Sequence, residues 1–594
     1  MKTIDNKKGY DKILRRLFRK AEVSYTVSDI SKALGPMIDL VFISQFIGTD
    51  GVTVIGYVGP LIMLFELVGT TISSGARNKV SSLIGAGKQE EADRAFSGSL
   101  FSGAVLSLFM VLLVSIFCSG VSMLLGARAP GIMQMTFGYI YGYLIGFPFF
   151  ALTRILTPYL QIEGKYPLVT GISLLTTGID VAADAFVVFV LYGGMFEIGL
   201  ATSLGYIVPF FFCVSYFLRR KNRHAFHFSF RKVDPVQCLE ILKIGAPAGI
   251  VKTSSFLGGI LINNMLTAMS MPYLVAAYGV FSQITVFVRS SWYAPADSLQ
   301  AFTGLFIGEE DRESLKEVQK LALIHGLFFT GFVMAVLFAF AGPAASVLMK
   351  SEDPAAMIMS VECIRVACLS LPFHAIVYSF NNYLMVGKRP HFCRVYSFLI
   401  ECGVPVPVTL LTLLAAGYHG AWISKPISMA VLSALAIFYI SRNRQAGSFR
   451  EKMLLLPETF GVSEENELAI IATSVDEIQE LSHIAVAFAL EHEADRKRAR
   501  TYGLLVEELA IFLSEHGFVD GKPHNIYARL VAKDADLIIR LRDDCKPLNL
   551  IDYYEAVKAD CAETDEPGLS IIMKIAREAS YCASFGVNNL IVRI

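Results

Sequence analysis

Residues 168–192, LVTGISLLTTGIDVAADAFVVFVLY, form an apolar run interrupted by only two charged side chains, Asp180 and Asp184. The run is long enough for a helix that crosses the hydrocarbon core of a bilayer, which takes about 20 residues. Only helices satisfy their own backbone hydrogen bonds in lipid at this hydrophobicity. An ionisable side chain in such a helix is costly, so carboxylates at these positions indicate a function. This stretch therefore predicts a helical membrane protein that carries a buried acidic site.

Eleven further runs of similar length and composition lie between residues 21 and 441. The sequence thus predicts an all-α membrane part of twelve transmembrane helices, at residues 24–47, 53–76, 96–119, 134–158, 168–192, 197–218, 243–268, 274–299, 318–342, 360–384, 394–416 and 420–441.

The charge distribution divides the chain into two regions. Charged residues make up 18% of the 594 residues, whereas a soluble globular chain has about 25%. Residues 461–594 nevertheless contain 38 charged residues in 134 and carry a net charge of −10, which leaves +10 on residues 1–460. This shift in composition predicts a water-exposed domain after the membrane part.

Several classes of protein are excluded by the composition. The ten cysteines include no CxxC pair, so neither a disulfide framework nor a zinc ribbon is indicated. The basic residues flank apolar runs and form no patch, so we expect no nucleic acid partner. The lipid bilayer is the partner that the composition predicts.

The basic residues of the loops predict the orientation in the membrane. Lys88, Lys165, Arg219 and Arg389 lie in even-numbered loops, whereas the odd-numbered loops carry almost no basic residues. By the positive-inside rule, we expect a multi-pass protein of the cytoplasmic membrane with both termini in the cytoplasm.

An internal repeat relates the two halves of the membrane part. Gly85 matches Gly308, and the motif that starts at Gly164 matches the one that starts at Gly387, both at an offset of 223 residues. Six helices per repeat place both halves in the same orientation, so we expect two lobes related by an axis along the membrane normal, with a cleft between them. Such lobes favour a secondary transporter, and the alternative is a duplicated scaffold that no longer transports.

The predicted organisation has five parts: an N-terminal segment at 1–22, a first six-helix lobe at 23–225, a second lobe at 226–445, a linker at 446–465 and a cytoplasmic domain at 466–594.

Four motifs carry a family resemblance. MIDLVFI (37–43), IGAGKQEEA (84–92), LQIEGKYP (160–167) and LKIGAPAGI (242–250) together resemble signatures of the multidrug and toxic compound extrusion (MATE) family. The resemblance covers roughly residues 20–445. It implies an antiporter, not an enzyme, that exports amphipathic and often cationic small molecules in exchange for Na+ or H+.

Three acidic residues lie within the predicted spans. Asp180 and Asp184 share one helix face because they are four residues apart, and Asp39 lies in the first span. Neighbouring carboxylates in low dielectric must share a proton or bind a cation. The resemblance adds Thr202 and implies that Asp39, Asp180, Asp184 and Thr202 form the cation site, which would hold Na+ if the protein is sodium-coupled. The family has Asn where this chain has Asp180, so the resemblance does not identify the ion. The alternative is that the acids pair with a buried base such as Arg154.

The tail alternates between short strands and helices. Residues 467–473 read as a strand, 475–491 and 498–515 as helices, and 526–531 with 535–541 as a hairpin. The last residues, NNLIVRI, read as another strand. This pattern predicts a small α+β domain.

The tail also resembles the GHKL ATPase-like fold of anti-sigma factor serine kinases. The motifs VEELAIFLSEHG and EPGLSIIMKIAREASY carry this resemblance. The implied nucleotide site is degenerate: Glu508 and Asp543 are present, Phe512 replaces the Asn that holds Mg²⁺, and only Gly568 remains of one glycine box. A phenyl ring offers no oxygen to a hard cation. We therefore expect no cofactor and no ATP binding, and a domain that regulates the transporter or binds a cytoplasmic protein partner.

The sequence thus favours a cation-coupled antiporter with a fused regulatory domain. The alternative is a membrane-bound signalling protein, in which the bundle senses a ligand and the tail acts on a sigma-factor-like partner.

Overall fold

The computed structural model describes residues 2–125, 129–218, 226–271, 274–348, 354–387, 389–443, 448–457, 459–462, 464–472, 475–518, 524–533, 536–545, 548–559 and 567–594. The predicted basic loop 219–223 lies outside the described residues.

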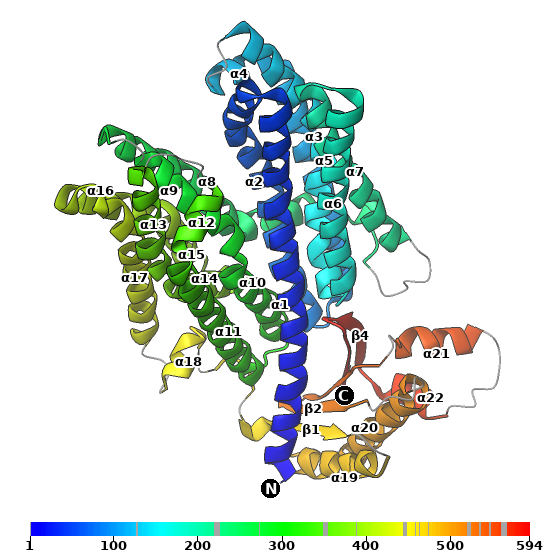
Figure 1. Ribbon diagram of the computed structural model, residues 1–594. Coiled ribbons are helices and arrows are strands. Elements are labelled where there is room, and N and C mark those ends of the chain that lie inside the picture. Colours follow the sequence, from blue (N-terminus) through cyan, green and yellow to red (C-terminus); the bar gives the residue numbers. More distant parts are fainter. Residues whose placement is uncertain are drawn as a thin grey trace.

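The chain forms two helical lobes and a small domain with a sheet (Figure 1). The first lobe contains α1 (Lys2–Phe42), α2 (Thr49–Gly85), α3 (Gln89–Ile116), α4 (Cys118–Leu125), α5 (Pro130–Ile162), α6 (Tyr166–Phe186) and α7 (Met195–Leu218). The second lobe contains α8 (Pro235–Ala268), α9 (Leu274–Val288), α10 (Ser290–Gly308), α11 (Arg312–Ala339), α12 (Ala341–Leu348), α13 (Pro354–Ala367), α14 (Leu371–Val386), α15 (Pro390–Phe398), α16 (Pro405–Ala416) and α17 (His419–Ser441).

Short turns connect or extend these helices. Five-residue π-helical turns occur at Ile43–Ile47, Val187–Leu191 and Leu399–Gly403, and single 3₁₀ turns occur at Phe230–Lys232, Cys368–Ser370 and Glu464–Asn466.

Eleven helical segments of the described residues are long and apolar enough to cross a membrane, against the twelve spans that the sequence predicts. The prediction is wrong for the eighth span, 274–299, because the structure divides this region into α9 and α10, which meet at Arg289. Serines, Asp297 and Pro295 follow the break and make α10 less apolar than the other spans. The shorter apolar helix Ala277–Val288 remains from the predicted span.

The C-terminal domain, residues 467–594, has one antiparallel sheet of strand order β1-β2-β3-β5-β4. Its elements are β1 (Glu467–Ala472), α19 (Val475–Glu491), α20 (Arg496–Gly517), β2 (Ile526–Lys533), β3 (Asp536–Asp543), α21 (Leu550–Ala559), α22 (Pro567–Ile575), β4 (Glu578–Ser584) and β5 (Val587–Arg593). The predicted strands, hairpin and first two helices of the tail are confirmed. A short helix, α18 (Phe449–Met453), lies in the linker.

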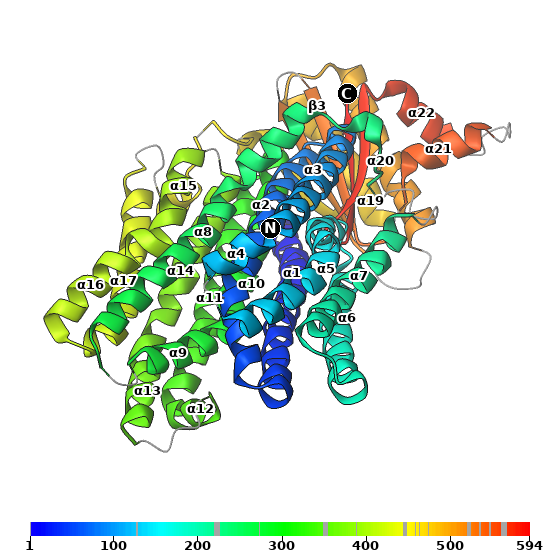
Figure 2. The same ribbon diagram turned by 90° about the horizontal axis from the view of Figure 1, so that it is seen from above.

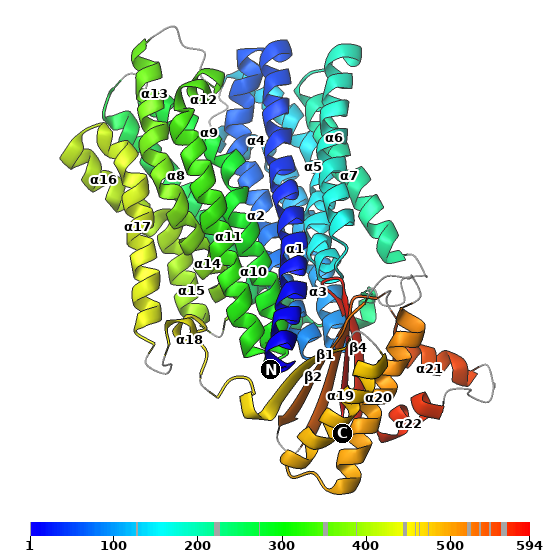
Figure 3. The same ribbon diagram turned by 60° about the horizontal axis from the view of Figure 1, so that its bottom comes forward.

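The sheet lies between the membrane bundle and helices α19 and α20 (Figure 3). Figure 2 shows that the domain is displaced toward the first lobe. The face toward α19 and α20 packs alternate apolar residues such as Ala528, Leu530, Ile539 and Leu541 into the domain core, as the period of two in a strand requires. We call the end of the bundle that contacts this domain the tail-side end.

The two lobes approach most closely where α2 and α10 cross at the tail-side end. A Cβ atom on Gly85 would lie 2.1 Å from the carbonyl oxygen of Leu305, and one on Gly308 would lie 2.0 Å from that of Ser82. Gly85 and Gly308 are related by the 223-residue repeat, and so are Ser82 and Leu305. The crossing is therefore pseudo-symmetric, and glycine is needed because no side chain fits between the backbones. From here the lobes diverge with distance from the C-terminal domain (Figure 1).

Replacing Gly85 or Gly308 by Ala should destabilise this closed crossing, because the new methyl group meets backbone atoms that cannot move independently. We expect the free energy of unfolding to fall by about 1–3 kcal/mol, as for other overpacked contacts, and a thermal melt would measure the loss. Gly56→Ala is the matched control, since it lies on α2 with no atom within 4 Å of the added Cβ. An equal effect of all three substitutions would contradict the close crossing.

Candidate functional site

A cavity of about 430 Å³ lies between the two lobes. Its walls come from α1, α2, α5, α6 and α7 of the first lobe and from α8, α10 and α14 of the second, with Arg289 at the break between α9 and α10. This volume is in the range of small-molecule binding sites. The cavity therefore occupies the position of the cleft that the repeat predicts.

The structure brings the predicted cation-site residues together at the first-lobe side of this cavity. Asp39 on α1, Asp180 on α6 and Thr202 on α7 line it, whereas Asp184 lies behind them and is fully buried. Asp184 neighbours both other carboxylates, and Asp180 also neighbours Thr202. Helices α1, α6 and α7 thus contribute all four side chains.

Close packing holds Asp180 between the two neighbouring helices. A Cβ on Gly35 of α1 would lie 3.3 Å from Oδ2 of Asp180, and a Cβ on Gly205 of α7 would lie 3.0 Å from the Cβ of Asp180. Only small residues at these two positions allow α1 and α7 to approach α6 this closely. The carboxylate consequently has a fixed position between the helices.

Four of the six carboxylate oxygens of the three acids have no hydrogen-bond partner among the described residues. Both carboxylate oxygens of Asp184, and Oδ1 of Asp39 and of Asp180, are buried and have no partner among the described residues. The Thr202 hydroxyl donates to the backbone oxygen of Ile198 at 3.3 Å, so its lone pairs remain available. Buried charge without a partner is costly. A site whose possible ligand atoms are all oxygens fits a proton or a hard cation such as Na+.

Arg154 does not pair with these acids. Its guanidinium lies 5.8 Å from the ring centre of Phe150, and no ion pair within the described part of the chain links it to Asp39, Asp180 or Asp184. The interpretation of the three acids as partners of Arg154 is therefore not supported.

Other charged residues of the cavity form ion pairs. Lys32 pairs with Asp29 at 3.2 Å, Lys252 with Glu66 at 3.0 Å, and Arg77 with Asp297 at 3.7 Å. The last pair joins the lobes, because Arg77 is on α2 and Asp297 on α10, and Asn382 donates to Asp297 at 3.0 Å.

Sequence reasoning missed Tyr139 of α5. Its buried phenol interacts electrostatically with Asp39, Asp180 and Asp184, and it lines the cavity. A tyrosine within an apolar run carries no distinct signal, since many such residues only pack.

The predicted degenerate nucleotide site is filled by an aromatic cluster. The ring of Phe512 stacks on His516 at a centroid distance of 4.7 Å and meets Tyr553 edge-on at 5.3 Å. Burial and the neighbouring carboxylates Glu507 and Glu515 raise the pKa of Glu508 above its ordinary value. The position of the missing Asn thus contains apolar and ring atoms.

Asp543, a residue of the implied nucleotide site, forms hydrogen bonds within the domain. Asn588 donates to its Oδ1 at 2.6 Å, and the backbone N–H of Cys545 donates to the same atom at 3.1 Å. Burial raises the pKa of Asp543, although the bond from Asn588 opposes the shift. Gly568 lies in the first turn of α22, on a different element.

The sheet face opposite α19 and α20 carries three arginines. Arg529 of β2 is paired in register with Arg540 of β3, and Arg542 follows two residues later, so all three project from one face. Burial next to Arg529 lowers the pKa of Arg540 to about 10, which leaves its guanidinium charged at neutral pH. The face is thus strongly basic although it is buried.

These arginines contact both lobes. Arg540 donates to the backbone oxygen of Gly85 at 3.2 Å, and Arg529 donates to that of Glu309 at 3.2 Å. Arg542 forms an ion pair with the Glu309 carboxylate. The loops after Gly85 and Gly308 are equivalent in the repeat, so one sheet binds the same structural feature of each lobe.

The β4–β5 hairpin makes a second contact at the tail-side end. The backbone N–H of Phe585 donates to the carbonyl of Ile162 at 2.5 Å, and its buried ring lies 4.7 Å from that of Phe302. Gly164 and Gly586 touch so closely that a Cβ on Gly164 would lie 2.1 Å from the Gly586 nitrogen. The hairpin tip is therefore inserted between the first lobe and α10.

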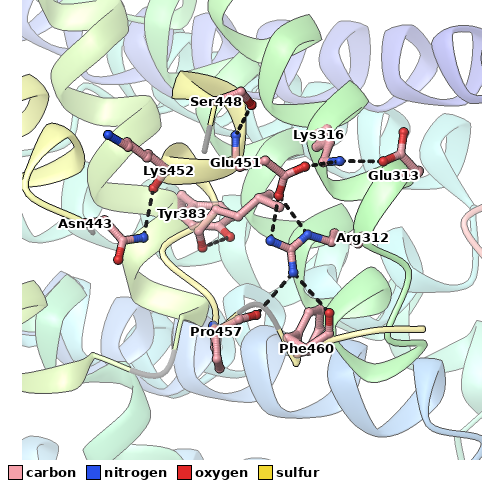
Figure 4. Close-up of polar contacts among 11 residues, drawn as sticks. Arg312, Glu313, Lys316, Tyr383, Asn443, Ser448, Glu451, Lys452, Pro457 and Phe460 are labelled. Atoms are coloured by element: carbon pink, nitrogen blue, oxygen red, sulfur yellow. Dashed lines mark hydrogen bonds and ion pairs between the residues drawn. The ribbon is translucent and has the colours of Figure 1, made fainter. Parts of the chain in front are cut away.

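The linker is anchored on the second lobe (Figure 4). Arg312 donates to Oε2 of Glu451 at 2.6 Å and to the backbone oxygens of Pro457 and Phe460 at 3.1 and 3.2 Å. Lys316 forms an ion pair with Glu451, and Tyr383 donates to the Leu454 carbonyl at 2.5 Å. These bonds fix the path of the chain into the C-terminal domain.

Comparison with known proteins agrees with this geometry. The family model described as MatE matches residues 26–186 and 247–411. Multidrug export protein MepA of Staphylococcus haemolyticus is 23% identical over 417 residues, which cover 69% of this chain and 89% of that protein.

Two solved structures share the fold of the membrane part. One is the outward-facing conformation of a multidrug resistance MATE family transporter of the MOP superfamily, with a TM-score of 0.68 and 16% identity over 72% of this chain and 95% of the other. The other is a MOP superfamily transporter from Pyrococcus furiosus, with a TM-score of 0.67 and 17% identity over the same shares. The family match ends at residue 411, before the C-terminal domain. MATE family members are secondary multidrug transporters and not enzymes, and this multi-pass membrane protein belongs to the MATE family.

Proposed function

We propose that the protein exports amphipathic small molecules across the cytoplasmic membrane in exchange for Na+ or H+. The observation that carries this proposal is the group of three neighbouring carboxylates, Asp39, Asp180 and Asp184, which lies beside the cavity between the lobes and has four buried oxygens without a hydrogen-bond partner in the described part of the chain. Because unpaired charge in a membrane interior is costly, these acids are stable only when a cation or protons neutralise them. The ion would be held by the three acids and Thr202.

Ion binding would then be linked to the movement of the lobes. In the conformation described, α2 and α10 touch at the tail-side end, which we assign to the cytoplasm. The cavity would exchange substrate with the opposite side in this state. Neutralisation of the carboxylates removes their mutual repulsion and lets α1, α6 and α7 repack, which would favour opening at the tail-side end. Such a cycle exchanges an entering cation for a leaving substrate.

Stability measurements test the cation site without knowledge of the substrate. A ligand that binds only the folded state stabilises it by about 2.7 kcal/mol at a hundredfold excess over its Kd. We expect the melting temperature of the purified protein to rise with Na+ if sodium is the coupling ion, or with falling pH if protons are. Asp184→Asn should abolish the response.

Asp50→Asn is the control, because Asp50 is an exposed carboxylate in the first turn of α2 and should leave the response unchanged. A melting temperature that is insensitive to both Na+ and pH in the wild-type protein would contradict the proposed coupling.

We further propose that the C-terminal domain regulates export. This is supported by the contacts of its sheet with the equivalent loops of both lobes, and by the insertion of its hairpin next to α10. A domain that holds both loops stabilises the state in which they are close together. Opening at the tail-side end would require these contacts to break, so a cytoplasmic partner that releases the domain would promote transport. The GHKL-like resemblance fits such a role without ATP turnover.

Phe585→Ala should weaken the hold of the domain on the lobes, since the buried ring between the hairpin and Phe302 is lost. We expect hydrogen exchange in residues 82–92 and 303–314 to accelerate about fivefold or more. A fivefold change corresponds to the low end of typical coupling free energies between sites. Leu504→Ala on α20, a half-exposed residue away from the interface, should not change exchange in these segments. If Phe585→Ala accelerated exchange only within the C-terminal domain, the domain would not control the crossing of α2 and α10.

A further inference from the structure

Two arginines of the cavity belong neither to an ion pair among the described residues nor to the proposed cation site. The lining contains five acidic side chains (Asp29, Asp39, Glu66, Asp180 and Asp297) and five basic ones (Lys32, Arg77, Arg154, Lys252 and Arg289). Three acids and three bases pair with one another, and Asp39 and Asp180 belong to the proposed cation site. Within the described residues, neither Arg154 nor Arg289 forms an ion pair with a carboxylate.

The part of the cavity around Arg154 and Arg289 is therefore positively charged. Glu66 interacts electrostatically with Lys252, Arg154 and Arg289, so both arginines lie near this acid. Its charge is offset by the Lys252 ammonium at 3.0 Å. Two guanidinium charges are left without compensation. Arginine does not lose its proton in proteins, so these charges cannot be removed by titration.

The two arginines belong to opposite lobes. Arg154 is on α5 of the first lobe, and Arg289 is at the break between α9 and α10 of the second. The residue equivalent to Arg289 in the repeat is Glu66, so the two lobes present opposite charges at this position. A ligand held by both guanidinium groups would consequently bridge the lobes.

A guanidinium group binds carboxylate, phosphate and sulfonate groups through parallel hydrogen bonds. Such charge-assisted contacts are stronger than neutral hydrogen bonds and fix the geometry of the bound group. The wall also contains aromatic side chains, among them Phe150, Tyr206 and Tyr293. The site therefore combines an anion-binding centre with a surface for a hydrophobic body.

We propose that the transported molecules are amphipathic organic acids, whose anionic group is held between Arg154 and Arg289. This inference rests on the proposed export function, and it names the substrate class. The cation that enters the carboxylate site and the anion between the arginines occupy separate parts of one cavity. Net cationic substrates would be repelled from the part around the two arginines.

Dye binding tests the charge of the ligand. Fluorescein and rhodamine 6G share a xanthene ring system, and at pH 8 fluorescein is a dianion and rhodamine 6G a cation. Fluorescence anisotropy with the full-length protein in lipid nanodiscs gives a Kd for each dye. We expect fluorescein to bind at least tenfold more tightly than rhodamine 6G. Arg154→Gln and Arg289→Gln should each weaken fluorescein binding by about tenfold, as expected for loss of a charge-assisted hydrogen bond.

Arg365→Gln is the matched control, because Arg365 of α13 lies over the ring of Phe338 and outside the cavity. It should leave both affinities unchanged, and thermal melts of all variants identify any that fail to fold. Tighter binding of rhodamine 6G, no saturable binding of fluorescein, or fluorescein binding that survives both cavity substitutions would each overturn the proposal.

Transport of the same dyes separates this proposal from the proposed function. If a cation gradient drives rhodamine 6G and not fluorescein across proteoliposome membranes, export holds and the assignment of an anionic substrate fails. If fluorescein binds through the two arginines and no gradient moves it, the anion site holds and the export function fails.

Discussion

Uncompensated charge within a membrane-spanning bundle is the constraint on which this structure depends. Ten acidic and basic side chains line one cavity of about 430 Å³, where a charge without a partner is costly. The protein neutralises six of them by ion pairs. Asp39 on α1 and Asp180 on α6 have no such partner among the described residues. The same holds for Arg154 on α5 and for Arg289 at the start of α10. Those two groups define where small ions and ligands would bind.

The internal repeat explains how the bundle closes at the tail-side end. Gly85 and Gly308 let two equivalent helices cross with their backbones in contact. Gly85 lies against the carbonyl of Leu305, and Gly308 lies against the carbonyl of Ser82, the residue equivalent to Leu305 in the repeat. The C-terminal domain binds the loops directly after these glycines. The same pseudo-symmetric feature thus closes the bundle and provides the domain with a binding surface. If the domain is the regulator proposed above, it would act by holding this crossing at the tail-side end of the bundle.

Much of the fold follows from the sequence, because long apolar runs and alternating strands are local signals. The run 168–192 and the strands of the tail are found by this reasoning, and so is the grouping of Asp180 with Asp184 on one helix face. Local sequence signals do not predict the break at Arg289, because a single arginine, some serines and one proline do not show whether a transmembrane helix continues. The faces occupied by Glu66 and Asp297 depend on packing between lobes, which a single sequence does not contain. Docking of Phe585 against Phe302 joins residues 283 positions apart, and no local pattern encodes such a contact.

The central claim is that the carboxylate site couples a cation to the movement of substrate through the cavity. Its most direct test is dye accumulation in proteoliposomes under an imposed Na+ or pH gradient, with wild-type protein and Asp184→Asn. The account predicts that fluorescein accumulates against its concentration only while a cation gradient is present, and that Asp184→Asn binds the dye but does not accumulate it. Equal accumulation by Asp184→Asn, or accumulation by the wild-type protein without any gradient, would contradict the account.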